Sequence, residues 1–144
     1  MVNAIKKEII LRSKNYNEEI ETIYYGGGTP SLLKIKDIED IFLAIENNYN
    51  LSNNLEITIE VNPDDLSKEK LKSLSKTKIN RISLGIQTLN DNSLKLMKRV
   101  HSSKQSIESI ENSLLFFKNI SIDLIYRYDF KSKRNRCYST ESVL

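Results

Sequence analysis

Residues 21–31 read Glu-Thr-Ile-Tyr-Tyr-Gly-Gly-Gly-Thr-Pro-Ser, a strand-like run that leads directly into three consecutive glycines. Glycine has no Cβ and tolerates positive φ, so the main chain of Gly26–Gly28 is able to approach a ligand closely. Pro30 ends the extended run, and Ser31 is suited to begin a helix. The spaced glycines of a dinucleotide site and the lysine of a Walker A loop are missing, so this loop alone fits either a binding loop or a tight turn.

Strand and helix patterns alternate along the rest of the chain. Ile38, Ile41, Phe42 and Ile45 have the spacing of an amphipathic helix. The predicted strands cover 21–25, 55–61, 81–87 and 120–126, and the predicted helices cover 5–13, 38–45, 67–74, 90–97 and 107–117. In the last of these helices the apolar stripe is expected at Ile107, Ile110, Leu114 and Phe117. Four strands separated by helices indicate parallel βα units.

Each later strand has one apolar and one small or polar face. In 55–61, Ile57, Ile59 and Val61 alternate with Thr58 and Glu60. The strands 81–87 and 120–126 repeat this alternation, with Ser83, Gly85, Gln87, Ser121 and Asp123 on the polar side. A closed barrel fills its interior with bulky side chains, and an open doubly wound sheet buries apolar residues on both faces. The pattern therefore predicts a wide or incomplete barrel with a ligand in its lumen.

Polar residues also mark the carboxyl end of each strand. Glu60, Gln87 and Asp123 take these positions, next to the glycine loop of the first strand. Ligands of parallel α/β proteins bind at this end. Two carboxylates, an amide and free backbone groups suit a polar metabolite such as a nucleoside or an amino acid. Arg99, just after the helix that follows the third strand, is suited to pair with a ligand carboxylate.

Composition narrows the class of protein further. The chain has 144 residues, a net charge of +3, 39% hydrophobic and 28% charged residues, and no apolar run that approaches the roughly 20 residues of a membrane span. With no signal-peptide pattern, the cytoplasm is the expected location. The modest basic excess is concentrated in the last twenty positions, so a general nucleic-acid surface is not indicated. Cys137 is the single cysteine, which excludes a disulfide or a multi-cysteine metal site within this sequence.

Five segments stand out for their order and spacing: Tyr25–Leu33 (YGGGTPSLL), Glu56–Pro63 (EITIEVNP), Asn80–Gln87 (NRISLGIQ), Arg99–His101 (RVH) and Ile122–Tyr126 (IDLIY). Together they resemble the radical S-adenosylmethionine (SAM) proteins, specifically the oxygen-independent coproporphyrinogen III oxidase-like family and its heme chaperone branch. The resemblance covers about residues 21–126. It implies an α/β fold, a partial parallel (βα) barrel that is truncated here at both ends and keeps about four strands.

The resemblance also implies roles for the strand-end residues. Gly27, Gly28 and Thr29 would line the methionine part of SAM, and Glu60 would approach its sugar or amino end. The residues that would complete the pocket are Gln87, Arg99 and Asp123. Intact family members are implied to use a [4Fe–4S] cluster and to act in porphyrin and heme metabolism, with heme as a further partner.

Two departures from the family pattern lead to further expectations. The Cys-x-x-x-Cys-x-x-Cys loop that ligates the cluster is missing, so this chain alone is expected to be inactive. After Tyr126 the family pattern stops, and residues 127–144 read as a basic tail, disordered or frameshifted. We therefore expect residues 1–126 to be a partial core domain, the central piece of an interrupted gene. Its unpaired sheet edges would favour self-association.

Other interpretations stay open from the residues themselves. Glu60 and Asp123 also fit strand-end carboxylates that merely bind nearby amides, and His101 fits a structural histidine without a catalytic role. The chain could be a non-catalytic nucleoside-binding or interaction fragment. It could also be an unrelated α/β enzyme whose glycine loop binds phosphate. A preference for SAM or for a phosphorylated ligand separates these hypotheses.

Overall fold

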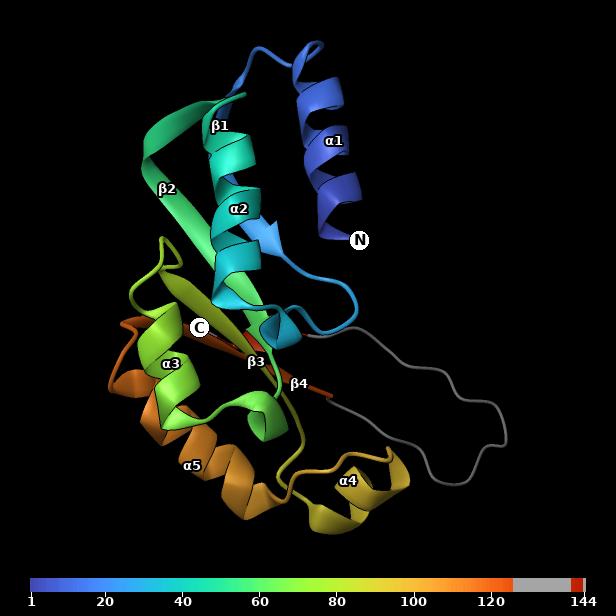
Figure 1. Ribbon diagram of the computed structural model, residues 1–144. Helices are drawn as coiled ribbons and strands as arrows, with labels where there is room; N and C mark the ends of the chain where they lie inside the picture. The colour runs from blue at the N-terminus through green and yellow to red at the C-terminus, as the bar shows by residue number, and fades with distance from the viewer. Residues whose placement is uncertain (126–140, 144) are drawn as a thin grey trace.

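The computed structural model describes residues 1–125 and 141–143 (Figure 1). Four parallel strands alternate with helices, and a short fifth strand follows. The elements are α1 (Val2–Ser13), β1 (Glu19–Tyr25), η1 (Pro30–Leu32), α2 (Ile35–Glu46), β2 (Asn50–Val61), η2 (Pro63–Asp65), α3 (Lys68–Leu74), β3 (Arg81–Gln87), α4 (Asp91–Leu96), α5 (Ser103–Leu114), β4 (Asn119–Leu124) and β5 (Glu141–Val143). The prediction of an α/β protein with four parallel strands is confirmed.

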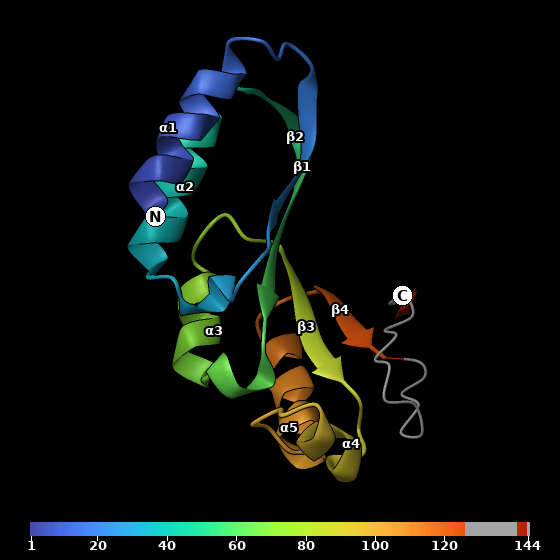
Figure 2. The ribbon, with the colours of Figure 1, turned by 90° about the vertical axis from the view of Figure 1, so that its right-hand side faces the viewer.

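The strands lie in the order β1-β2-β3-β4-β5, and only β5 runs antiparallel to its neighbour. Helices α1, α2 and α3 lie on the same side of the strands (Figure 2). Glu60, Ser83 and Ser121 are in register across β2, β3 and β4, and Ile59, Ile82 and Ile120 form the adjacent row. Because side chains alternate along a strand, polar rows share one face of the sheet and apolar rows share the other.

The apolar face and the helices that cover it form the core. Ile59, Ile82 and Leu84 are completely buried, and Leu71 and Leu74 of α3 are buried with them. From α2, Ile38, Ile41, Phe42 and Ala44 contribute its buried face, as the spacing predicted for the first three. The polar face is left open for a site.

Helix α5 packs differently from the prediction. Its buried residues are Ser106, Ser109 and Ser113, whereas Ile107 is 46% and Leu114 60% exposed. The expected stripe was therefore wrong for these two positions. The helix begins at a Ser102–Gln105 capping box, and its small serines allow close packing. The Ser113 hydroxyl donates to the Ser109 carbonyl (2.7 Å), and the Ser109 hydroxyl donates to the Pro63 carbonyl (3.3 Å), so burial leaves these serines satisfied.

Two further differences concern strand ends. Strand β2 begins at Asn50, five residues before the predicted start, and a register irregularity against β1 lies between Ile20 and Thr22. Backbone pairing with β1 extends the strand through a polar segment that carries no alternating pattern. The predicted tail 127–144 lies outside the described residues except for Glu141–Val143, which pair with Ile122–Leu124 as β5. Among the described residues, none of the helices is long and apolar enough to cross a membrane.

Candidate functional site: a polar pocket at the strand ends

A cavity of about 270 Å³ lies on the polar face, at the carboxyl ends of the parallel strands. Six of the seven residues predicted for the site line it, and the seventh, Gly27, contacts one of them. The lining residues are Gly28, Thr29, Pro30, Glu60, Val61, Asn62, Ser83, Gly85, Gln87, Arg99 and Asp123. Parallel strands end at one edge of the sheet, so residues far apart in sequence converge here.

The glycine loop is held in a conformation that favours glycine. Gly27 has φ of +79° and Gly28 has φ of +62°, and a Cβ on either would meet no atom within 4 Å. The backbone conformation, and not crowding, therefore explains the choice of residue. The Gly27 N–H donates to Glu60 Oε2 (3.3 Å), which joins the loop to the end of β2. This contact is the one that the structural interpretation of Glu60 expects, and it also holds the carboxylate at the cavity.

Asp123 and Tyr24 complete the acidic side of the pocket. The Ser83 hydroxyl donates to Asp123 Oδ1 (3.2 Å), which fixes the carboxylate from the neighbouring strand. Tyr24 lies on the polar face and is 54% exposed, whereas Tyr25 on the apolar face is buried. Desolvation raises the pKa of Tyr24 and Ser83 opposes this shift, while the negative charges of Glu60 and Asp123 raise the pKa further. The carboxylates of Glu60 and Asp123 therefore both lie near enough to the Tyr24 hydroxyl to raise its pKa.

Gln87 lies in an unusual turn at the end of β3. Its φ is +66°, and the Thr88 N–H donates to the Ile86 carbonyl (2.8 Å), which together describe a classic γ-turn, a rare and strained conformation. A Cβ on Gly85 would lie 3.0 Å from Gln87 Nε2 and 3.1 Å from Asn62 Oδ1. The glycine in β3 thus makes room for two polar side chains at the pocket.

The sequence placed Ser83 and Gly85 on the polar face of their strand, but neither of them nor Asn62 was predicted as a site residue, and all three line the cavity. A glycine inside a strand is a known sign of close approach, and this signal could have identified Gly85. Arg99 reaches the pocket from the turn after α4 and donates from Nη1 to Asn62 Oδ1 (3.4 Å). The cavity lining therefore contains the positively charged guanidinium of Arg99 together with the negatively charged carboxylates of Glu60 and Asp123.

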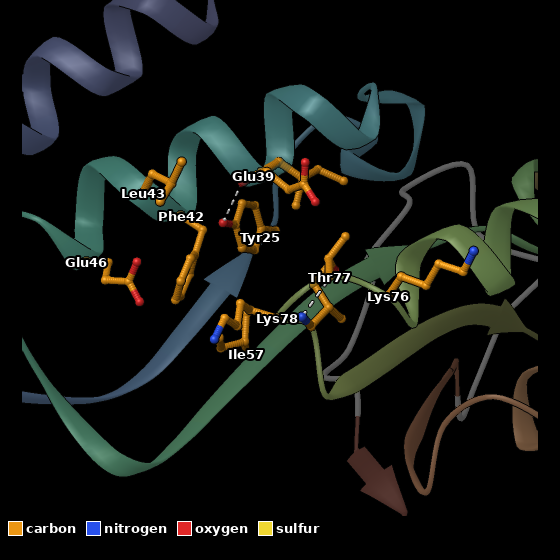
Figure 3. A pocket seen from close by; sticks show the side chains of 11 residues that line it. Tyr25, Glu39, Phe42, Leu43, Glu46, Ile57, Lys76, Thr77 and Lys78 are labelled. Carbon is orange, nitrogen blue, oxygen red and sulfur yellow. Dashed lines mark hydrogen bonds between the residues drawn. The ribbon is translucent and has the colours of Figure 1, made fainter.

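A second cavity, of about 300 Å³, lies on the opposite face of the sheet, between α2, strands β1 and β2, and the segment 76–79 (Figure 3). Tyr25 and Phe42 stand between the helix and the strands. The Tyr25 hydroxyl donates to the Ile38 carbonyl (3.2 Å), and burial raises the pKa of Tyr25 to about 12. The surface of this cavity is mainly apolar, although Glu39, Glu46, Lys76 and Lys78 also line it. Neither a glycine loop nor an arginine is part of its lining, in contrast to the strand-end pocket.

The fold and the strand-end pocket define a class of protein: a parallel α/β protein whose strand-end cavity is lined by a glycine loop, two carboxylates, two side-chain amides and a guanidinium. The sequence matches the Radical SAM superfamily over residues 3–126, and the chain belongs to that superfamily.

Relatives narrow this assignment. The heme chaperone HemW of Lactococcus lactis is 46% identical over 110 residues, which are 76% of this chain and 29% of the relative. The heme chaperone HemW of Bacillus subtilis is 38% identical over 146 residues, which cover 99% of this chain and 38% of the relative. The chain therefore spans about a third of the length of these relatives and is a HemW/HemN-like segment.

A solved structure agrees with the fold. Coproporphyrinogen III oxidase (HemN) from Escherichia coli, described as a radical SAM enzyme, matches with a TM-score of 0.75 and 27% identity. The match covers 86% of this chain and 29% of HemN. This likeness supports the partial radical SAM fold that the resemblance implied.

The residues present fit one of the family's two cofactors better than the other. Carboxylates, backbone amides and a guanidinium suit the ammonium, hydroxyl and carboxylate groups of SAM. A [4Fe–4S] cluster requires thiolates, and the 144 residues contain a single cysteine, Cys137, which lies outside the described part. Residues 1–125 and 141–143 hold no group of three or more side chains suited to a metal.

Proposed function

We propose that this chain forms the SAM-binding part of a heme chaperone-type radical SAM protein. The observation that carries the proposal is the common cavity of Gly28, Thr29, Glu60, Gln87, Arg99 and Asp123. Its volume of about 270 Å³ is just below the roughly 300 Å³ at which small-molecule pockets begin. These residues would therefore enclose part of SAM and leave the remainder to other segments or to solvent.

Each polar part of SAM has residues of this chain that are suited to bind it. Positive φ at Gly27 and Gly28 turns the backbone so that its polar groups are able to meet the methionine part. Glu60, held by the Gly27 N–H, is suited to accept from the sugar hydroxyls or the ammonium. Arg99 is suited to the methionine carboxylate, because a guanidinium pairs with a carboxylate through two parallel hydrogen bonds.

The wider function belongs to the whole protein. In the family, the cluster supplies the electron that cleaves SAM, and the residues of this chain would bind and orient the molecule to be cleaved. We also propose heme as the cargo of the whole protein, since the relatives are named heme chaperones. No described residue is assigned to heme.

The proposal is tested by titrating SAM into the purified 144-residue chain in a calorimeter. Glu60→Gln and Asp123→Asn each remove one charged acceptor, so each should weaken binding about tenfold or more, since hydrogen bonds to charged groups contribute about 1.5–3 kcal/mol. Glu39→Gln is the matched control, because Glu39 lies at the apolar cavity on the opposite face. Its affinity for SAM should equal that of the original chain.

Two results would overturn the proposal. Binding of ATP or pyrophosphate in place of SAM would favour the phosphate-binding α/β enzyme. Binding of none of these ligands by a folded chain would favour an interaction fragment without a working pocket.

A further inference from the structure

His101 is buried beneath the pocket, and both of its ring nitrogens face oxygen acceptors. Its side chain is 0% exposed. Nδ1 lies 3.2 Å from Asp64 Oδ1, and Nε2 lies 3.4 Å from the Ile86 carbonyl oxygen. Both partner oxygens are hydrogen-bond acceptors, so the imidazole is placed to contact each of them through a different ring nitrogen. His101 thus joins two segments, η2 and the end of β3, that lie far apart in sequence.

The contact of His101 Nε2 with the Ile86 carbonyl reaches the strained turn at Gln87. The Ile86 carbonyl accepts from His101 and also from the Thr88 N–H (2.8 Å), which closes the γ-turn. Strained backbone of this kind costs on the order of 1–3 kcal/mol and persists only where its surroundings hold it. The second restraint is the Ile125 N–H, which donates to the Gln87 carbonyl (2.8 Å). The imidazole is therefore one of the groups that hold this conformation.

The contact of His101 Nδ1 with Asp64 reaches the segment that follows β2. Asp64 follows Asn62 by two residues, and His101 follows Arg99 by two residues. Arg99 donates to Asn62 Oδ1 (3.4 Å), while His101 contacts Asp64. The segments 62–64 and 99–101 are thereby joined at two points, one of which lines the cavity and one of which lies behind it.

We propose that His101 is a positioning residue of the strand-end pocket. It does not line the cavity. It fastens the Gln87 turn and the Asn62–Asp64 segment so that the Gln87 amide is held over Gly85, in reach of a ligand. This inference rests on the proposed binding of SAM, because the positioned amide is one of the groups proposed to contact it.

A buried histidine that only stabilises the fold would predict something different. Its loss would lower the melting temperature and would act on SAM affinity in the same way whether or not Gln87 is present. A positioning residue acts through Gln87, so its effect on affinity should disappear when that side chain is removed. Two residues that act through one contact show this non-additivity in a double-mutant cycle.

The experiment uses the full 144-residue chain with His101→Asn, His101→Gln and Gln87→Ala. Asparagine keeps a donor near the Nδ1 position and loses the one near Nε2, and glutamine does the reverse. His101→Asn should weaken SAM binding about tenfold, the size expected for one lost hydrogen bond near a charged site, and His101→Gln should stay within about threefold. In the Gln87→Ala background, His101→Asn should change affinity by less than about twofold. Equal losses in both backgrounds would overturn the proposal.

A second measurement does not depend on SAM. Hydrogen exchange of the Thr88 amide, followed by NMR on the ligand-free chain, reports on the γ-turn directly. His101→Asn should increase this exchange rate severalfold, and His101→Gln should leave it close to the original value. If the unaltered chain fails to bind SAM, the proposed function fails, and the amide exchange still decides the role of His101. Should His101→Asn fail to fold, His101→Gln carries the test, because it keeps a donor near Nε2 for the Ile86 carbonyl. A severalfold increase of Thr88 exchange in folded His101→Gln would overturn the proposal.

Discussion

Two cavities of similar size lie on opposite faces of the same strands, and they differ in almost everything else. The strand-end pocket, of about 270 Å³, is lined by polar groups that four strands bring together. The outer cavity, of about 300 Å³, has a mainly apolar surface from Ile38, Phe42 and Leu43 of α2 and from Tyr25, Ile57 and Ile79, and four charged side chains also line it. Volume alone would not separate them. The convergence of polar groups at the ends of the parallel strands, next to the glycine loop, identifies the candidate site.

The two faces differ because side chains along a strand alternate between them with a period of two residues. Along β2, Ile57 and Ile59 face the helices, while Thr58 and Glu60 face the other way. One face therefore stabilises the fold and the other is available to bind. Substitutions on the two faces should accordingly separate stability from ligand affinity, and three predictions test this separation.

The largest effect is expected on the apolar side, from Phe42→Ala. Phe42 is 7% exposed and packs in the core next to the outer cavity. Loss of a buried phenylalanine costs about 3–5 kcal/mol, measured as the free energy of unfolding in a urea titration. The fraction that remains folded should bind SAM with unchanged affinity. Leu43→Ala is the matched control, because Leu43 is 49% exposed and should cost less than about 1 kcal/mol. Equal losses from both variants would contradict the packing of α2.

The second prediction concerns alkaline pH and Tyr25. Its pKa is raised from 10 to about 12 by burial, so the folded state holds the proton more tightly than the unfolded state. The stabilisation is therefore fully present below pH 10 and is lost as the pH rises toward 12. Two pKa units correspond to at most about 3 kcal/mol.

Tyr25→Phe provides the control for this pH dependence. The variant lacks the hydrogen bond to the Ile38 carbonyl and should be less stable at neutral pH by about 1 kcal/mol. It also lacks the titrating hydroxyl, so its stability should fall less steeply between pH 10 and 12. If the free energy of unfolding fell equally for the original chain and for Tyr25→Phe between pH 10 and 12, Tyr25 would not titrate from a buried state.

The sequence predicted much of the architecture, because the alternation of side chains along strands and their spacing along helices follow from backbone geometry. It failed on α5, where Ser106, Ser109 and Ser113 are buried and Ile107 is exposed. Small polar residues pack closely when their hydroxyls bind carbonyls, and such residues leave no apolar stripe to detect. The early part of β2 was missed for a related reason, since backbone pairing does not require alternation.

For the site, the sequence predicted which residues end the strands but not how they are held. Glu60, Gln87 and Asp123 share one cavity because parallel strands end together, although their contact with a ligand stays a prediction. The roles of Gly85 and His101 depend on contacts with other segments and on the turn at Gln87. The pattern of residues along the sequence predicts neither of these. Such second-layer contacts become visible only in three dimensions.

The smallest effect on stability, with the clearest separation of the two faces, is expected from Gly85→Ala. The new Cβ would lie 3.0 Å from Gln87 Nε2 and 3.1 Å from Asn62 Oδ1. Both atoms are at the ends of side chains, so they are able to move aside, and the free energy of unfolding should change by less than about 1 kcal/mol.

Movement of these same atoms changes the pocket itself. Displacing the Gln87 amide by a few tenths of an ångström should weaken SAM binding about tenfold, because a hydrogen bond is lost when its geometry is disturbed. Calorimetry of binding, together with urea unfolding of the same sample, measures both quantities. Gly85→Ala and Phe42→Ala should thus show opposite patterns, one losing affinity and the other stability. A variant of Gly85 that lost stability while keeping its affinity would mean that the polar face, like the apolar one, serves mainly to hold the sheet together.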